Sequence, residues 1–251
     1  SNMCHESSGI ALTESIGIGK GTVRLEDFNH SDLIVIVGQN PGTNHPRMLS
    51  ALRSAKTSGS SILSINPIRE TGMRSFRYPQ SPLDMLGSGV KIADDHVDIQ
   101  INGDMALFRA IGSVMIENGW IDKSFIDSNT SGYESYFKAS KRINWDDVEK
   151  ATGQSQSRIR ELAALFSKSR STIICWAMGI TQHKNSVHTI REIVNVLLLG
   201  GHIGRPGAGV CPVRGHSNVQ GDRTVGITHA PSEKFLSAIQ KIYGVTPVSS
   251  H

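Results

Sequence analysis

The chain has 251 residues, of which 38% are hydrophobic and 19% are charged, and its formal net charge is +4. This apolar content is enough for a packed core, and the low charged content excludes an intrinsically disordered chain. No apolar run is long enough to span a membrane, so we expect no transmembrane helix, and the first residues lack the pattern of a signal peptide. Because the net charge is small and Lys and Arg form no run, we expect no nucleic-acid partner.

The three cysteines, Cys4, Cys175 and Cys211, are far apart and odd in number. This usage excludes a disulfide scaffold and favours a reducing compartment, so we expect a cytoplasmic location. No C-x-x-C pair occurs, and we therefore expect no iron–sulfur cluster in this segment. Cys4 and His5 could together bind a soft metal and move a proton. Their spacing alone is more typical of an ordinary pair of residues in a chain terminus.

The predicted elements begin with a β-branched run at 32–38, which is typical of a buried strand. A loop follows, then a helix over 46–56 with a proline in its first position, and a second strand over 61–66. This β-loop-α-β order is the building block of a parallel sheet. Residues 67–95 are irregular, with several prolines and glycines, and alternation predicts a short strand over 97–101. Asp104 is a candidate cap for a helix over 105–118.

The remaining pattern is mainly helical from 122 to 168, with Asp122, Asp146 and Ser155 as candidate caps. A buried strand over 172–177, a loop over 178–183 and an apolar helix over 187–199 follow. Residues 204–226 are expected to form a loop, and residues 231–243 a final helix. Since strands and helices alternate, we predict an α/β fold with a mostly parallel, Rossmann-like doubly wound sheet covered by helices on both faces.

In open parallel sheets, ligands bind outside the carboxyl ends of the strands, where three predicted loops lie, at 38–45, 64–68 and 178–183. The first loop contains neither G-x-G-x-x-G nor the lysine of a P-loop. Its small residues precede a helix N-terminus, which favours an anion, although an ordinary strand-to-helix turn is the more common explanation of such a loop. Arg214 has a planar guanidinium suited to a carboxylate or phosphate, and it also fits a surface loop.

Several motifs occur in one order along the chain. They are Cys4-His5, IVIVGQNPGTNHP at 34–46, GITQ at 179–182, the apolar helix 187–199, GRPGAGV at 204–210 and PVRGHSNVQG at 212–221. This ordered set closely resembles the catalytic (alpha) subunits of molybdopterin oxidoreductases, above all formate dehydrogenases and the formate-dehydrogenase-like branch. The resemblance extends over roughly residues 2–230.

The resemblance implies molybdenum or tungsten held by two molybdopterin guanine dinucleotides. Cys4 matches the metal ligand of formate dehydrogenases, and His5 matches the histidine that follows it and could take a proton. Arg214 matches the active-site arginine, which would hold a small anionic substrate such as formate. The positions that match cofactor contacts are Gly38, Asn40, His45, Asn66, Pro67, Gln100, Gly103, Met178, Gly179, Gln182 and, beside the arginine, His216.

The sequence departs from the family pattern at two places. Ile68 replaces the arginine expected after Asn66-Pro67, and an inserted stretch follows at roughly 69–90. His216 replaces a glutamine that formate dehydrogenases often have two residues after the arginine, which weakens the assignment of formate as the substrate.

The chain resembles an internal fragment, about a third of an enzyme. We expect a dinucleotide-binding-like domain over 1–200 and the start of an adjoining domain, with the arginine loop, over 201–251. Its expected partners are the remaining domains of the parent chain and an electron-acceptor protein. By itself the fragment is expected to retain no cofactor and to be inactive, because much of the cleft would be missing. The alternative is a catalytically silent nucleotide-binding or interaction module with the same fold.

Overall fold

The computed structural model describes residues 4–227 and 231–247. One compact unit ends at Val213, and a smaller one begins at Arg214. The larger unit holds every strand of the described chain, and the smaller one contains α13 (Val219–Thr224) and α14 (Glu233–Tyr243). The predicted domain boundary at residue 200 concerns the whole protein and stays a prediction.

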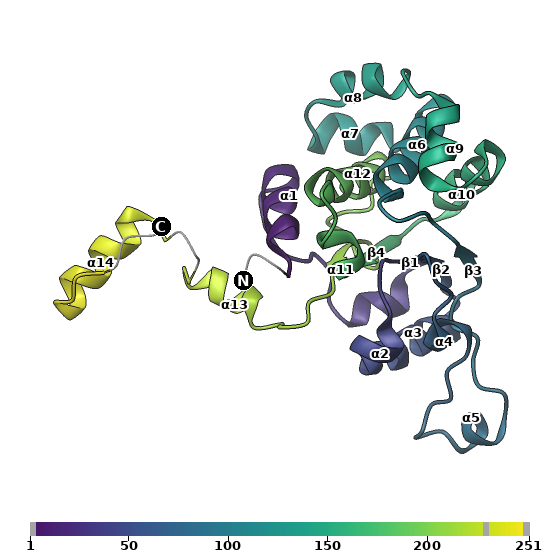
Figure 1. Cartoon of the computed structure of the whole chain (residues 1–251), viewed down its shortest axis with the longest axis horizontal. Helices are drawn as coiled ribbons and strands as arrows, with labels where there is room; N and C mark the ends of the chain where they lie inside the picture. The colour runs from purple at the N-terminus through teal and green to yellow at the C-terminus, as the bar shows by residue number, and fades with distance from the viewer. Residues whose placement is uncertain (1–3, 228–230, 248–251) are drawn as a thin grey trace. The chain divides into compact units, whose positions relative to one another are not determined.

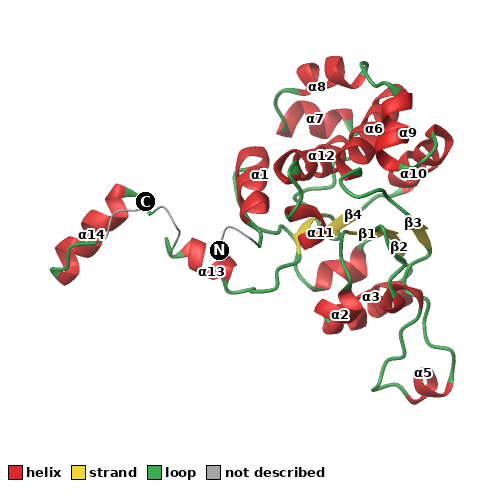
Figure 2. Ribbon diagram, in the orientation of Figure 1, coloured by secondary structure: helices red, strands yellow, loops and turns green. Residues whose placement is uncertain are grey.

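A parallel sheet forms the centre of the larger unit (Figure 2). In the described part of the chain its five strands are β1 (Leu33–Val37), β2 (Ser61–Ile65), β3 (Asp95–Val97), β4 (Thr172–Trp176) and β5 (Gly209–Pro212). Their order is β3-β2-β1-β4-β5, and every neighbouring pair is parallel. This arrangement confirms the predicted α/β fold class.

The strands are apolar on both faces because helices cover the sheet from both sides. Along β1, Leu33, Val35 and Val37 belong to one hydrophobic cluster. Ile34 and Ile36 alternate with them and belong to the other cluster. A run of five β-branched or leucine residues is therefore fully buried, as expected for a central strand.

The two helical layers lie on opposite sides of the sheet (Figure 1). One layer contains α1 (Glu6–Ile16), α6 (Asp104–Glu117), α10 (Gln156–Lys168) and α12 (Ser186–Leu199), extended by α7 (Lys123–Asn129), α8 (Tyr133–Ser140) and α9 (Trp145–Thr152). The other contains α3 (Pro46–Thr57), α4 (Thr71–Arg74) and the 3₁₀ helix η1 (Glu26–His30). Two one-turn helices, α2 (Pro41–Asn44) and α11 (Met178–Thr181), directly follow β1 and β4.

The structure corrects the predicted strand at 97–101. The strand β3 ends at Val97, because the chain then turns: the N–H of Gln100 donates to the carbonyl of Thr152, and Asn102 has a positive φ of 67°. Asp104 is not a cap but lies in the first turn of α6. The α9 helix is capped by Asn144, not by Asp146.

Other elements were absent from the sequence prediction. Residues 204–226 contain β5 and α13, although they were expected to form a loop. β5 is short, begins with glycine and ends with proline, so its strand conformation depends on pairing with β4. The irregular region 67–95 contains α4 and α5 (Pro82–Leu86), and its outer part projects away from the sheet (Figure 1).

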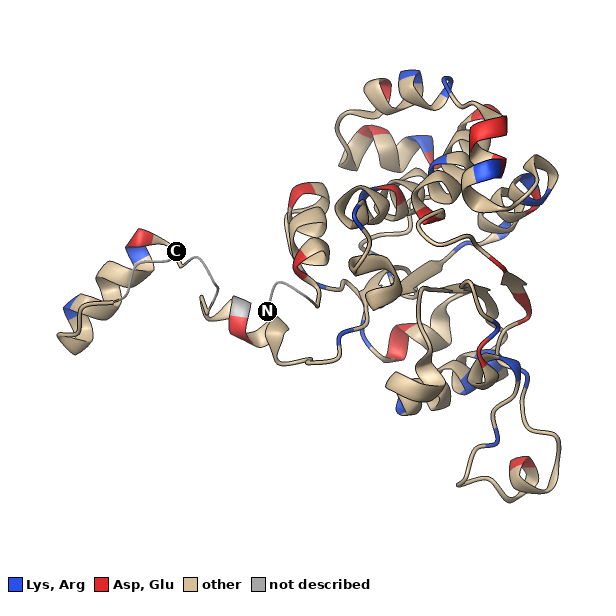
Figure 3. Ribbon diagram, in the orientation of Figure 1, with Lys and Arg blue, Asp and Glu red and all other residues tan. Residues whose placement is uncertain are grey.

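Basic and acidic residues are interspersed over the surface of the larger unit (Figure 3). Several form ion pairs, such as Arg160 with Glu117 at 3.0 Å and Arg170 with Asp32 at 2.9 Å. Within residues 4–227 and 231–247, none of the helices has the length and apolar character needed to cross a membrane.

His202, just after α12, supplies a pH-dependent contribution to stability. Its side chain is 2% exposed, and burial, followed by the charge of Arg205, lowers its pKa from 6.5 to about 4. Between these two values the unfolded chain binds a proton that the folded chain does not. The contribution of His202 to the free energy of unfolding therefore falls as the pH decreases from 6.5 to 4.

We expect His202→Gln to remove this pH dependence. Relative to the variant, the native chain should lose about 3 kcal/mol of stability between these pH values. Urea unfolding of both proteins across this range measures the difference. The exposed His188, replaced by Gln, is the matched control. Parallel pH profiles for the native chain and His202→Gln would contradict the assignment.

Candidate functional site

The candidate site lies at the carboxyl edge of the sheet. All strands are parallel, so the segments that follow them emerge at the same edge. The strand order reverses between β1 and β4, because the chain continues to β2 on one side and to β5 on the other. Such a switch point is where open α/β sheets bind ligands. The predicted contacts Gly38 and Asn40 follow β1, and Met178 and Gly179 follow β4.

At this switch point the backbones of two loops touch through glycines. The N–H of Gly179 donates to the carbonyl of Gly38 at 3.1 Å. A Cβ atom on Gly179 would stand 2.5 Å from that oxygen, closer than real Cβ contacts allow. Gly38 also has a positive φ of 56°, which glycine adopts without strain. The two glycines thus permit a close approach that any side chain would prevent.

Glu70 connects the loops after β1 and β2. Its carboxylate accepts a hydrogen bond from the Nδ2 of Asn40 at 2.6 Å and from the Nδ2 of Asn66 at 3.3 Å. Asn40 also accepts from the N–H of Thr43 through its Oδ1, and so caps α2. The structure therefore brings the predicted contacts Asn40 and Asn66 together through a residue that the sequence analysis did not identify.

The other predicted contacts of this edge lie nearby in the chain. His45, half-buried, lies between α2 and α3, Pro67 is exposed after Asn66, and Gln182 is exposed at the end of α11. All three residues lie in segments that connect the strands with the following helices, so strand pairing does not fix their positions.

Gln100 and Gly103 are placed by their packing against the end of α9. A Cβ atom on Gly103 would stand 2.4 Å from the carbonyl oxygen of Ala151. The side chain of Gln100 lies against Gly153, and the backbone N–H of Gln100 donates to the carbonyl of Thr152. The structure thus gives both residues a packing role in the turn between β3 and α6.

Three buried polar atoms near this edge have no hydrogen-bond partner among the described residues. They are Oε1 of Gln39, Oγ1 of Thr181 and Nδ1 of His183. Gln39 follows β1, and the other two follow β4. A buried polar atom without a partner costs free energy, so these atoms fit a polar ligand that would satisfy them.

A buried carboxyl lies beside the same loops. Asp104 is 3% exposed, and burial raises its pKa to about 6. Its Oδ2 atom is 3.9 Å from Nδ1 of His183, whose pKa burial lowers. A small movement of either side chain would bring these two atoms within hydrogen-bond distance, where one group could donate a proton to the other.

His5 is held in a network that spans three elements. Its Nδ1 lies 2.9 Å from Oγ of Ser8 in α1, and its Nε2 lies 3.0 Å from the carbonyl oxygen of Val213, just after β5. The indole N–H of Trp176, at the end of β4, donates to the same Oγ of Ser8 at 3.0 Å. His5, Ser8 and Trp176 are almost completely buried.

The network fixes the tautomer of neutral His5. A carbonyl oxygen can only accept, so Nε2 carries the hydrogen that Val213 receives. Nδ1 is then the free base, and it accepts from the hydroxyl of Ser8, whose oxygen accepts from Trp176. Every bond has a donor and an acceptor, and a proton added to the ring would go to Nδ1.

Cys4 is half-buried and directly precedes His5 and α1. Within the described residues, no three or more His, Cys, Asp or Glu side chains gather into a group that could hold a metal ion.

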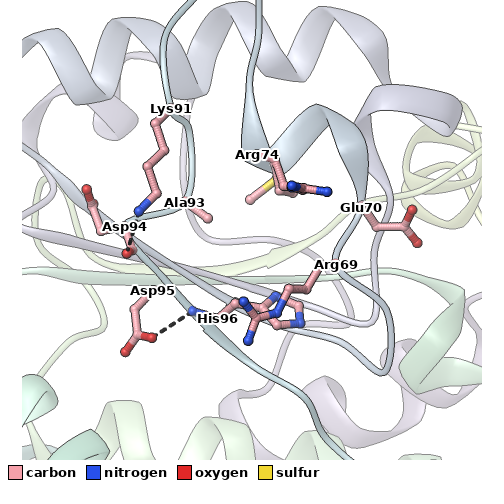
Figure 4. A pocket seen from close by; sticks show the side chains of 9 residues that line it. Arg69, Glu70, Arg74, Lys91, Ala93, Asp94, Asp95 and His96 are labelled. Carbon is pink, nitrogen blue, oxygen red and sulfur yellow. Dashed lines mark hydrogen bonds between the residues drawn. The ribbon is translucent and has the colours of Figure 1, made fainter.

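A cavity of about 290 Å³ lies beside the edge strand β3 (Figure 4). Lys91, Asp94 and Asp95 line one part, and Glu70 stands at the opposite side of the view. Burial lowers the pKa of His96, also in the lining, although its Nε2 is 3.1 Å from Asp98.

Arg69, which also lines the cavity, is bound to Asp98 at 2.9 Å. Ile68, at the position of the expected arginine, is 66% exposed. The guanidinium of Arg69, the next residue, thus forms an ion pair with the residue that follows β3.

Arg214 and His216 belong to the smaller unit. Arg214 directly follows Val213, and its side chain is buried, whereas that of His216 is exposed. The roles that the sequence predicts for Arg214 and His216 stay predictions.

The comparisons with known proteins agree with this architecture. A sequence profile of molybdopterin oxidoreductases matches residues 4–246. An uncharacterized oxidoreductase of Mycobacterium tuberculosis, Rv2900c, is 51% identical over all of this chain and 33% of its own length. Protein YdeP of Escherichia coli is 45% identical over 98% of this chain and 34% of its own length. Formate dehydrogenase H of Escherichia coli is 33% identical over 98% of this chain and 33% of its own length.

The fold also matches a solved structure. Acetylene hydratase from Pelobacter acetylenicus superposes with a TM-score of 0.66 at 20% identity, over 98% of this chain and 34% of that one. The chain thus spans about a third of the length of its curated relatives.

The extent of the profile match shows that the chain belongs to the molybdopterin oxidoreductase family. Membership implies a molybdenum or tungsten pterin cofactor in general, and it confirms the family that the ordered motifs predicted.

The Gly38–Gly179 contact yields a first prediction for this site. Gly179→Ala places a methyl group against the carbonyl of Gly38 and should lower the free energy of unfolding by about 1–3 kcal/mol. Gly221→Ala is the control, because a Cβ atom there meets no heavy atom within 4 Å. Urea unfolding compares the two variants. Equal stabilities would show that the loops separate without cost.

The His5 network yields a second prediction. Ser8→Ala leaves the buried indole N–H of Trp176 and Nδ1 of His5 without their partner, at a cost of about 1–3 kcal/mol. Ser167→Ala, which removes an exposed hydroxyl bonded to Ala164, serves as the control in the same unfolding measurement. A loss no larger than that of the control would exclude a stabilising network at His5.

Proposed function

We propose that the whole protein containing this chain is a molybdenum or tungsten oxidoreductase with two molybdopterin guanine dinucleotides. It would catalyse the two-electron oxidation of a small anionic substrate, with formate as the first candidate. Family membership supports the pterin cofactor, and the similarity to formate dehydrogenase H supports the substrate class. When bound, the metal centre would supply the site for two electrons.

The single observation that carries the proposal is the glycine contact at the switch point. Gly38 and Gly179 bring the loops after β1 and β4 backbone to backbone, and the unpaired atoms of Gln39 and Thr181 lie on the same loops. Phosphates are commonly bound where small residues let backbone N–H groups approach them. The residues present therefore fit a dinucleotide.

The predicted contacts divide between two edges of this region. Gly38, Asn40, His45, Asn66 and Pro67 would serve one pterin dinucleotide, with Glu70 orienting the two asparagine amides. Met178, Gly179 and Gln182 would serve the other from α11. Gln100 and Gly103 would contribute mainly by shaping the turn after β3.

Cys4, His5 and Arg214 are the residues proposed for the chemistry. Cys4 would bind the metal through its thiolate. His5 would take the substrate proton at Nδ1, the nitrogen that neutral His5 leaves unprotonated, and Ser8 would keep hydrogen-bonding the ring after its hydroxyl rotates. Arg214 would hold a carboxylate with two parallel hydrogen bonds, and His216 would adjoin it.

The partners of this activity are part of the proposal. The remaining domains of the parent chain would complete the cofactor cleft, and an electron-acceptor protein would remove the electrons. All three cysteines are free thiols, which fits a reducing compartment, so we propose a cytoplasmic location.

The test uses the complete protein, purified after expression in a host that makes the cofactor. We expect molybdenum or tungsten by metal analysis, and guanosine monophosphate after acid hydrolysis. Arg214→Lys should keep both and raise the KM for formate by about tenfold, because the two parallel hydrogen bonds are lost. The exposed Arg47, replaced by Lys, is the control.

A preparation with neither metal nor pterin would contradict the proposal and favour the silent nucleotide-binding or interaction module. A loaded protein that does not oxidise formate would reject only that substrate. The substitution of glutamine by His216 makes other small anions the next candidates.

A further inference from the structure

Two of the free cysteines are neighbours in the sheet. Cys175 on β4 and Cys211 on β5 are paired residues in the parallel register. Paired residues of neighbouring strands point to the same face, and both side chains belong to the hydrophobic cluster that contains Ile34 and Ile173. Beside burial, the neighbouring Cys211 thiol raises the pKa of the Cys175 thiol, as expected for two sulfurs on the same face of paired strands.

The spacing of the strands suits a disulfide. Neighbouring strands lie about 4.7–4.9 Å apart, and disulfides join Cα atoms separated by about 4.4–6.8 Å. The Cβ atoms of a disulfide stand only about 3.5–4.5 Å apart, so the two strands must move slightly closer. A bond formed in this way is strained and therefore easily reduced.

The two thiols differ in their access to solvent. Cys175 lies on an inner strand with no exposed surface, and burial raises the pKa of its thiol. Cys211 lies on the outer strand β5 and is partly exposed. A small oxidant therefore reaches Cys211 first, and Cys175 is protected from it.

We propose that Cys175 and Cys211 form a site of reversible oxidation, at which hydrogen peroxide produces a disulfide between β4 and β5. The thiolate of Cys211 attacks one oxygen of the peroxide, breaks the O–O bond and becomes a sulfenic acid, with hydroxide released. The sulfur of Cys175 then attacks the sulfur of Cys211, and the S–O bond breaks. The hydroxyl leaves with the proton of Cys175 as water. Two thiols lose two electrons and two hydrogens, and one peroxide becomes two waters.

The bond would act on the His5 network. Cys211 precedes Val213, whose carbonyl accepts from His5, by two residues. Cys175 directly precedes Trp176, whose indole N–H donates to Ser8. Drawing β4 and β5 together therefore moves both anchors of the network. The thiol chemistry itself needs no metal or pterin, so it stands apart from the proposed function.

The experiment treats the reduced 251-residue chain with hydrogen peroxide and then blocks the remaining thiols by alkylation. We expect the oxidised chain to take up one alkyl group, on Cys4, where the reduced chain takes up three, a peptide map to join the Cys175 and Cys211 peptides, and dithiothreitol to reverse both changes. The indole N–H resonance of Trp176 should shift on oxidation and return on reduction, because its partner Ser8 belongs to the network.

Variants separate this pair from the third cysteine. Cys4→Ser should form the disulfide as the native chain does. Cys211→Ser should lose it completely. Cys175→Ala should accumulate a sulfenic acid on Cys211, trapped by dimedone. Circular dichroism tests whether each variant is folded. If Cys175→Ala is unfolded, Cys175→Ser is used in its place.

Three results would overturn the proposal. One is a cross-link that involves Cys4, and another is a cross-link that persists in Cys211→Ser. The third is a native chain in which Cys211 is oxidised to sulfenic acid and no disulfide follows.

Discussion

The close contact between Gly38 and Gly179 is the constraint on which the candidate site depends. The N–H of Gly179 bonds to the carbonyl of Gly38, so the loops after β1 and β4 meet backbone to backbone at the reversal of strand order. A side chain at either position would separate α2 from α11. The contact therefore sets the spacing between the two groups of predicted cofactor contacts, and Glu70 extends the same arrangement to the loop after β2.

The sequence predicts well those elements that are buried and therefore have a continuous run of apolar residues. The strands β1, β2 and β4 are of this kind, and each was placed within one or two residues, as were α3, α6 and α12. β5 could not be predicted, because its glycine and proline are poor strand formers and parallel pairing with β4 alone makes it a strand. For β3, the alternation at 97–101 was misleading, since a turn bonded to Thr152 follows Val97.

The candidate site could be predicted where it depends on strand order, and not where it depends on distant contacts. Gly38, Asn66 and Gly179 follow strands of one parallel sheet, so their common edge follows from the pattern. Glu70, Ser8 and Trp176 gain their roles only from folding, since Ser8 and Trp176 are 168 residues apart. Glu70 carried one available signal, a carboxylate four residues after Asn66 in an otherwise irregular loop.

The position of His5 depends on two strands, β4 and β5, that are far from it in the sequence. Its ring bonds to the carbonyl after β5 and, through Ser8, to the indole at the end of β4. The register between these strands thus determines where the histidine and the adjoining Cys4 lie. That register is held by backbone bonds and by packed side chains, among them the buried Cys175 and the partly buried Cys211. An element that appeared from sequence to be an ordinary chain terminus is therefore part of the core, and its geometry is controlled from the opposite layer of the sheet.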